Sequence, residues 1–188
     1  MVLIGPRFLL RDLRPEDARA LLDLRVANRE FLEPFEPERR EEFFTLQAQS
    51  LEIERGMRDS EEDRAYPFGV FARARQELIG GLRLSSVVRG AWHNANLGYF
   101  IGRHHNGRGA GTESVALALE FAFEHCGLHR VQAAVMPANG ASIRVLEKNS
   151  FRLEGHAPRY LKIGGAWRDH KIFAITREEW TPRVAGVR

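Results

Sequence analysis

Three glycines at alternate positions constrain this chain more than any other feature of its sequence. They lie in the stretch HHNGRGAGTES, residues 104–114. A glycine inside an element costs about 0.5–1 kcal/mol relative to alanine, so three together indicate a close approach of the backbone to another group. Apolar residues at helical spacing follow the loop, and the N–H groups at a helix start favour an anion. The loop therefore predicts an anion-binding turn that leads into a helix.

Two widespread phosphate-binding motifs do not match this loop. A Walker-type loop needs a lysine directly after its glycines, and none follows Gly111. A dinucleotide fingerprint has G-x-G-x-x-G after the first strand of a βαβ unit. Here the glycines stand at 107, 109 and 111, after several strands expected to be antiparallel. A flexible turn with incidental glycines ranks below an anion-binding role in this context.

The composition is that of an ordinary soluble globular protein. The chain has 188 residues, of which 44% are hydrophobic and 28% charged, which argues against wholesale disorder. No apolar run approaches the roughly 20 residues that span a bilayer, and the first residues become charged too soon for a secretory signal. The single cysteine, Cys126, cannot form an internal disulfide, so we expect a cytoplasmic location.

Positive and negative charges are mixed along the chain. The 28 basic and 25 acidic residues give a net charge of +3, without a block of like charge. A nucleic-acid-binding module would cluster its arginines and interleave aromatic residues. We therefore expect no specific nucleic-acid partner and no membrane partner. No sequence feature decides whether the chain forms a homodimer.

The hydrophobic pattern predicts a single α/β domain over residues 1–188. Gly164 and Gly165 mark the turn of a C-terminal hairpin, and the order of elements indicates a mixed sheet with flanking helices. In chain order we expect a strand over 8–13, helices to about 30 and over 38–57, strands over 67–74, 77–88 and 94–102, a helix ending before 127, a strand over 129–136, a helix over 139–149 and a hairpin over 151–176.

The stretch NGRGAGTES, after LGYFIG and before NGASIRVLEKNSFRLEG, resembles the GNAT superfamily of N-acetyltransferases. In that family a loop [QR]-x-x-G-x-[GA] holds the pyrophosphate of coenzyme A with main-chain amides; here Asn106 replaces the usual Gln or Arg. The resemblance implies a single-domain GNAT-like fold with a mixed, largely antiparallel central sheet, flanked by helices and splayed between two middle strands. It implies acetyl-CoA as the acetyl donor and no metal. The cofactor-binding residues that it implies are Phe100, Ile101, Gly107, Arg108, Gly109, Ala110, Gly111, Thr112 and Asn139.

Four further stretches narrow the resemblance. ANREFLEPFEP, SSVVRGAWHNANLGYFIG, MPANGAS and GGAWRDHKIFAIT are similar to the bacterial ribosomal-protein-alanine N-acetyltransferases. This implies that the acceptor is the N-terminal α-amine of a protein, a ribosomal protein in that group, with Glu36, Trp92 and His93 as acceptor-binding residues. An N-acetyltransferase of a small-molecule amine and a non-catalytic acetyl-CoA sensor are the alternatives.

The resemblance also implies roles in catalysis. The pantetheine arm would insert between the strands LGYFI and HRVQAAVM, where main-chain groups of Phe100 and Ile101 would pair with it. An amide facing the thioester carbonyl is worth about 2.7–4 kcal/mol. Asn139 would bond pantetheine or cap its helix, and both roles are compatible. Ser142, one turn on, would protonate the departing thiolate; a surface-facing helical serine is the alternative.

The sequence offers no evident general base. The family often has a glutamate two residues before GY, and Asn96 stands there. An α-amine has a pKa about 2.5 units below that of lysine, a difference worth about 3.4 kcal/mol, so this site suits an α-amine better. Glu36 and His93 are the remaining candidates on the acceptor side, and each is read more readily as a peptide-binding or structural residue.

The motif WRDH does not provide a catalytic dyad. Asp169 and His170 are neighbours on an expected strand, so their side chains point to opposite faces. We expect a structural hydrogen bond for one and a site-facing role for the other, without deciding which. The seven histidines lack the spacing of a metal site.

Overall fold

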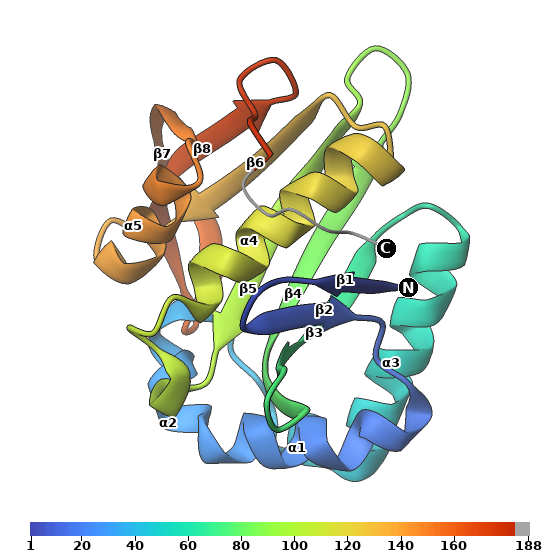
Figure 1. The fold of residues 1–188 in the computed structure, drawn as a ribbon. Helices are drawn as coiled ribbons and strands as arrows, with labels where there is room; N and C mark the ends of the chain where they lie inside the picture. Colours follow the sequence, from blue (N-terminus) through green and yellow to red (C-terminus); the bar gives the residue numbers. More distant parts are fainter. Residues whose placement is uncertain (183–188) are drawn as a thin grey trace.

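The structure, a computed structural model, describes residues 1–182 and contains an eight-stranded sheet in the order β1-β2-β3-β4-β5-β6-β8-β7 (Figure 1). Neighbouring strands are antiparallel except β5 and β6, which are parallel. The strands are β1 (Val2–Ile4), β2 (Phe8–Arg11), β3 (Tyr66–Ala72), β4 (Glu77–Val88), β5 (Asn94–Ile101), β6 (Arg130–Val135), β7 (Arg152–Ile163) and β8 (Ala166–Thr176). The α-helices are α1 (Ala18–Ala27), α2 (Arg29–Leu32), α3 (Leu46–Glu61), α4 (Ala110–Glu120) and α5 (Gly140–Lys148).

The parallel pair β5–β6 is short. Only three residues of β5, from Asn94 to Asn96, pair with β6, although both strands continue beyond that point. β4 follows β5 as far as Ile101, and β8 follows the whole of β6. The two middle strands therefore diverge, which confirms the predicted mixed, largely antiparallel sheet with a splay.

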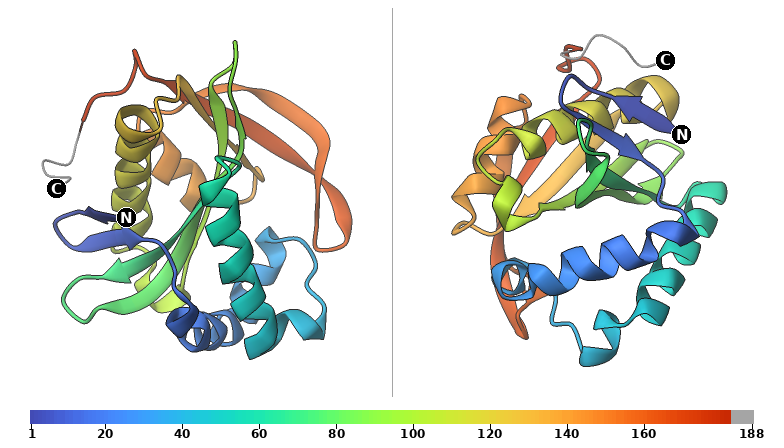
Figure 2. Two further views of the ribbon diagram at one scale, coloured as in Figure 1. Left: turned by 90° about the vertical axis from the view of Figure 1, so that its right-hand side faces the viewer. Right: turned by 60° about the horizontal axis from the view of Figure 1, so that its bottom comes forward.

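Helices cover both faces of the sheet. Helix α4 packs against β2, β4 and β5, whereas α3 packs against β3 and α1 against β4. Figure 2 shows α4 and α3 on opposite sides of the strands. Side chains of α4 enter the main core, and a second cluster lies under α1 and α3. Among residues 1–182, no helix is long and apolar enough to cross a membrane.

One predicted helix has the wrong boundaries and one strand was missed, each for a local reason. The helix expected over 38–57 is divided: a 3-10 turn spans Glu41–Phe44, and α3 begins only after Thr45. Thr45 has an extended backbone and its hydroxyl accepts a hydrogen bond from Ala48 N at 3.2 Å, so it caps α3 and interrupts the helical path. Strand β1 was not expected, because three residues before Gly5 and Pro6 carry too little pattern.

One carboxylate joins the N-terminal hairpin to the start of α4. Glu113 Oε1 accepts hydrogen bonds from the backbone N–H groups of Arg7 and Phe8, at 2.8 and 2.9 Å. The Glu113 side chain is only 10% exposed, and a Cβ at Gly5 would lie 2.5 Å from the same oxygen. The turn between β1 and β2 is therefore fixed beside the glycine loop.

We expect Glu113→Ala to lower the free energy of unfolding by about 1–3 kcal/mol, because two backbone N–H groups lose their acceptor. Glu113→Gln keeps one acceptor oxygen and should lie between the two. Urea unfolding measures the difference, with Glu54→Ala on the exposed side of α3 as control. Equal stability of the Glu113→Ala and Glu54→Ala variants would contradict this account.

Candidate active site

A cavity of about 1370 Å³ opens where β5 and β6 diverge. Its walls come from the glycine loop, β4, β5, β6 and the start of α5, and it continues to side chains of α1, α3 and the segment after α2. Ligand pockets of proteins are usually about 300–1,000 Å³, so this one can hold more than a single small molecule. The cavity connects the glycine loop with the opposite face of the sheet.

The glycine loop has the backbone of an anion-binding turn. Gly107 and Gly109 have φ values of +73° and +83°, in the left-handed region that favours glycine. Gly109 caps α4, so the N–H groups of the first helical turn have no acceptor within the helix. Nothing lies within 4 Å of a Cβ placed on Gly107. The loop is therefore open at Gly107, whereas a Cβ on Gly109 would lie 2.6 Å from Arg7 Nη2.

The predicted loop residues do not all face the cavity. Those that line it are Gly107, Gly109, Ala110, Gly111 and Thr112; the side chain of Arg108 is not part of the wall. A Cβ on Gly111 would lie 3.3 Å from Val145 Cγ2, so this glycine lets α4 approach α5. Asn106 donates from Nδ2 to the carbonyl oxygens of Ile101 and Gly102, at 3.0 and 3.3 Å, and thereby holds the loop to the end of β5.

Strand β5 presents its two faces to two parts of the cavity. Tyr99 points toward α5, where its hydroxyl oxygen lies 2.9 Å from Ser142 Oγ. Phe100, the next residue, points the other way, and the Arg25 guanidinium of α1 lies 3.7 Å from the centre of its ring. Phe100 and Ile101 both line the cavity. Alternation along the strand thus separates an α5 side from an α1 side.

The start of α5 is capped as the sequence allows. Asn139 Oδ1 accepts a hydrogen bond from Ser142 N at 3.1 Å, and both residues line the cavity. The cap is confirmed, while a bond from Asn139 to a cofactor stays a prediction. Ser142 is half-buried against Tyr99, so the alternative of a surface-facing serine is wrong.

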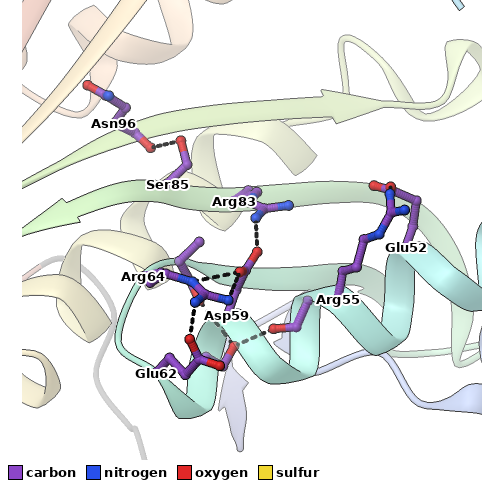
Figure 3. A network of polar contacts seen from close by, with 11 residues as sticks. Glu52, Arg55, Asp59, Glu62, Arg64, Arg83, Ser85 and Asn96 are labelled. Carbon is purple, nitrogen blue, oxygen red and sulfur yellow. Dashed lines mark hydrogen bonds and ion pairs between the residues drawn. The ribbon is translucent and has the colours of Figure 1, made fainter.

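Two side-chain amides are hydrogen-bonded at the point where β5 and β6 begin to diverge. Gln132 Nε2 of β6 donates to Asn96 Oδ1 of β5 at 2.7 Å, in the last paired position of the two strands. Figure 3 shows the same part of the sheet, where Ser85 Oγ donates to Asn96 O at 3.3 Å and Arg83 pairs with Asp59 of α3. Asn96 is therefore engaged through its side chain and its main chain, and it brings no carboxylate to the site.

A half-buried ion pair lies on the α1 side of the cavity. Arg25 Nη1 donates to Glu36 Oε1 at 2.7 Å, and the two side chains are 15% and 21% exposed. Burial lowers the pKa of Arg25, and the neighbouring Glu36 opposes that effect. Arg25 Nε is buried without a hydrogen-bond partner. Glu36 lines the cavity, and its predicted role in acceptor binding stays a prediction; Arg25, which sequence reasoning missed, holds Glu36 there.

Residues 7–152 match the family described as the acetyltransferase (GNAT) domain. The chain belongs to the GNAT acetyltransferase family. Two curated relatives match over nearly their whole length. The Probable N-acetyltransferase YjcK of Bacillus subtilis is 40% identical over 93% of this chain and 96% of its own. The ribosomal protein uS5-alanine N-acetyltransferase of Escherichia coli is 35% identical over 94% of this chain and 91% of its own.

Solved structures share the fold of this acetyltransferase. The ribosomal-protein-S5-alanine acetyltransferase from Vibrio fischeri has a TM-score of 0.90 and 28% identity, over 97% of this chain and 100% of that one. Mycobacterium smegmatis RimJ, in complex with CoA-disulfide, has a TM-score of 0.89 and 34% identity, over 98% and 88% of the two chains. These similarities confirm the predicted fold and the assignment as an N-acetyltransferase.

Trp92 and His93 lie away from the cavity of the acetyltransferase. They belong to the connection between β4 and β5, and neither is among the cavity's lining residues. The His93 carbonyl accepts from the amides of His129 and Arg130, at 2.8 and 3.0 Å, so it joins the starts of β5 and β6. The glycine loop follows the other end of β5, about 23 Å along the strand. A role of Trp92 and His93 in acceptor binding has no support from the cavity.

Asp169 and His170 point to opposite faces of β8, as predicted. Asp169 accepts from Arg159 N at 2.8 Å and lies 3.2 Å from the His156 ring, and the first of these bonds lowers the pKa of Asp169 most. His170 is buried, lines the cavity, and has Nδ1 2.9 Å from Arg168 O. Within residues 1–182 no cluster of three His, Cys, Asp or Glu side chains is arranged to hold a metal ion.

We expect Arg25→Ala to lower the free energy of unfolding by about 1–3 kcal/mol. The substitution leaves Glu36 half-buried without its partner and removes the guanidinium from the Phe100 ring; both groups reach solvent in part, so the loss stays below that of a fully buried pair. Arg29→Ala, which breaks an exposed pair with Glu41, is the matched control and should lower the stability clearly less than Arg25→Ala, because solvent screens an exposed pair. Urea titration of both variants tests this, and equal losses would contradict it.

Proposed function

We propose that this enzyme transfers the acetyl group of acetyl-CoA to the N-terminal α-amine of a protein, with a ribosomal protein as the acceptor class. The observation that carries the proposal is the cavity itself, which joins a glycine turn suited to phosphates with a second compartment across the sheet. Mycobacterium smegmatis RimJ, 34% identical to this chain, was solved with a coenzyme A derivative. The Escherichia coli relative is named for a ribosomal-protein alanine.

The residues around the cavity fit such a donor. Gly107 and Gly109 hold the backbone in the left-handed conformation, and the first turn of α4 offers N–H groups for the pyrophosphate. Main-chain groups of Phe100 and Ile101, in the part of β5 that has left β6, would bind the pantetheine arm. Arg108 would act through its amide, since its side chain is not part of the wall. Acetyl-CoA would supply the acetyl group as an activated thioester.

The two faces of β5 divide the chemistry. On the α5 side, the Ser142 hydroxyl would donate a hydrogen bond to the departing sulfur. On the α1 side, Glu36 and Arg25 would receive the extended N-terminus of the acceptor. The C–N bond forms as the C–S bond breaks, and the proton that the nitrogen loses balances the one that the sulfur gains.

An α-amine fits this site better than a lysine side chain. Asn96 provides no carboxylate and is hydrogen-bonded to Gln132, so no strong base stands at that position. The rate should then follow the fraction of amine that is free. Near pH 7.5 that fraction is about a third for an α-amine and about a thousandth for lysine. A cytoplasmic location, a single acetyltransferase domain and action on newly made ribosomal protein complete the proposal.

The glycine turn is tested with Gly109→Val. Valine at a φ of +83° is strained, so the turn should open and the affinity for coenzyme A should fall at least tenfold, measured by calorimetry. Gly90→Val is the matched control: Gly90 also has a positive φ, +68°, with nothing within 4 Å of its Cβ, and lies outside the cavity. A folded Gly109→Val variant with unchanged affinity would show that the turn does not bind the donor.

The acceptor is tested with two peptides. One begins with a free alanine and lacks lysine; the other is blocked at its N-terminus and has an internal lysine. We expect acetylation of the first alone, with kcat/KM rising with pH to about 8 as the α-amine loses its proton. Similar turnover of the blocked peptide would contradict the proposed acceptor. Rejection of both peptides with turnover of a small amine would favour the small-molecule alternative, and coenzyme A binding without any transfer would favour a sensor.

A further inference from the structure

One hydrogen bond in the cavity joins two side-chain hydroxyl groups from distant parts of the chain. Tyr99 on β5 and Ser142 on α5 have their hydroxyl oxygens 2.9 Å apart, and the Tyr99 hydroxyl can also donate to the carbonyl oxygen of Ser142, at 3.3 Å. Both residues line the cavity. They stand on the side of β5 opposite Phe100 and Arg25.

The surroundings hold both hydroxyls in place. A Cβ on Gly111 would lie 3.6 Å from Tyr99 Cε2, so the first turn of α4 packs against the edge of the ring. Asn139 fixes the backbone of Ser142 through its cap. Burial raises the pKa of Tyr99 to about 12, so the phenol keeps its proton at neutral pH and can serve as a donor.

The Tyr99 hydrogen has two acceptors within reach, Ser142 Oγ at 2.9 Å and Ser142 O at 3.3 Å, and the shorter distance favours Oγ. A hydroxyl has a single hydrogen to donate and can accept as well. If the Tyr99 O–H donates to Ser142 Oγ, the Ser142 hydrogen is free to point into the cavity. A donated bond also polarises Ser142 and strengthens the bond that it makes in turn. The alternative direction, from Ser142 to Tyr99, would take the serine hydrogen away from the cavity.

We propose that Tyr99 is the positioning residue that directs the Ser142 hydroxyl toward the sulfur of the acetyl donor. This inference rests on the proposed function. As the C–S bond breaks, its electron pair stays on sulfur, and Ser142 stabilises that charge through a hydrogen bond that Tyr99 reinforces. The proton that finally neutralises the sulfur is the one lost by the acylated nitrogen, passed through solvent. Both hydroxyls end the cycle in the protonation state in which they began.

The first test needs coenzyme A and no acceptor. The thiol of bound coenzyme A is titrated through the ultraviolet absorbance of its thiolate in the parent and in Ser142→Ala, Tyr99→Phe and the double variant. A donated hydrogen bond favours the thiolate, so the pKa of the bound thiol should rise by about one unit in Ser142→Ala and by about half a unit in Tyr99→Phe. The double variant should match Ser142→Ala, because Tyr99 acts through the serine. Tyr66→Phe, which removes a hydroxyl bonded to Asp63 outside the cavity, should change nothing.

The second test is the rate with any amine that the enzyme accepts. Tyr99→Phe should lower kcat about three- to tenfold, Ser142→Ala about ten- to a hundredfold, and neither should alter the affinity for acetyl-CoA much. Ser142→Thr retains a hydroxyl and should recover part of the rate. An unchanged thiol pKa in Tyr99→Phe, or an equal loss of rate from Tyr99→Phe in the presence and absence of Ser142, would overturn the role of Tyr99.

If Tyr99→Phe does not fold, the acidity of the Tyr99 hydroxyl can be changed while the hydroxyl itself is kept. The chain has three tyrosines, so 3-fluorotyrosine can be confined to Tyr99 after Tyr66 and Tyr160 are replaced by phenylalanine. A more acidic phenol is a stronger donor and should lower the pKa of the bound thiol further; a value that does not move would overturn the inference. Failure to acetylate any α-amine, with the thiol titration as expected, would contradict the proposed acceptor and leave the role of Tyr99 supported.

Discussion

The separation of β5 from β6 after three paired residues determines most of what this molecule can do. Beyond Asn96 and Gln132, the facing main-chain groups of the two strands no longer bond to each other. Buried backbone donors and acceptors require partners, so this stretch of sheet needs a ligand or water to complete it. Each strand keeps its outer neighbour, β4 for β5 and β8 for β6, so the opening does not weaken the sheet elsewhere. The cavity is the consequence of this one interrupted ladder.

The pleat of β5 places hydroxyl groups on one side of the strand and a charged, aromatic wall on the other. Successive side chains of a strand point to opposite faces, so Tyr99 and Phe100 serve different compartments although they are neighbours in the chain. Hydroxyl groups gather on the α5 side, and a charged, aromatic wall forms on the α1 side. A ligand that lies in the plane of the sheet is approached from both.

Local patterns predicted the parts of the site that a short stretch of chain builds alone. The glycine turn, the start of α4 and the Asn139 cap follow from residues within a few positions of one another. The contacts of Arg25 and Tyr99 could not be found in that way, because they join α1 to β5 and β5 to α5, and no spacing rule relates such segments. Strand alternation could have placed Tyr99 opposite Phe100, but not beside Ser142. Trp92 and His93 were assigned by resemblance alone, and the length of β5 separates them from the turn.

Strand β6 obtains most of its main-chain hydrogen bonds from β8, a strand that is synthesised later. All six residues of β6 pair with β8, whereas only three pair with β5. The Gly164 amide, in the turn before β8, also donates to Glu36 O at 3.1 Å. During synthesis the glycine turn and the β1–β2 hairpin leave the ribosome well before β8, so one wall of the cavity can form before β6 has paired with β8. Contacts over such long sequence separations form slowly, so the pairing of β8 with β6 is the step that completes this wall of the cavity.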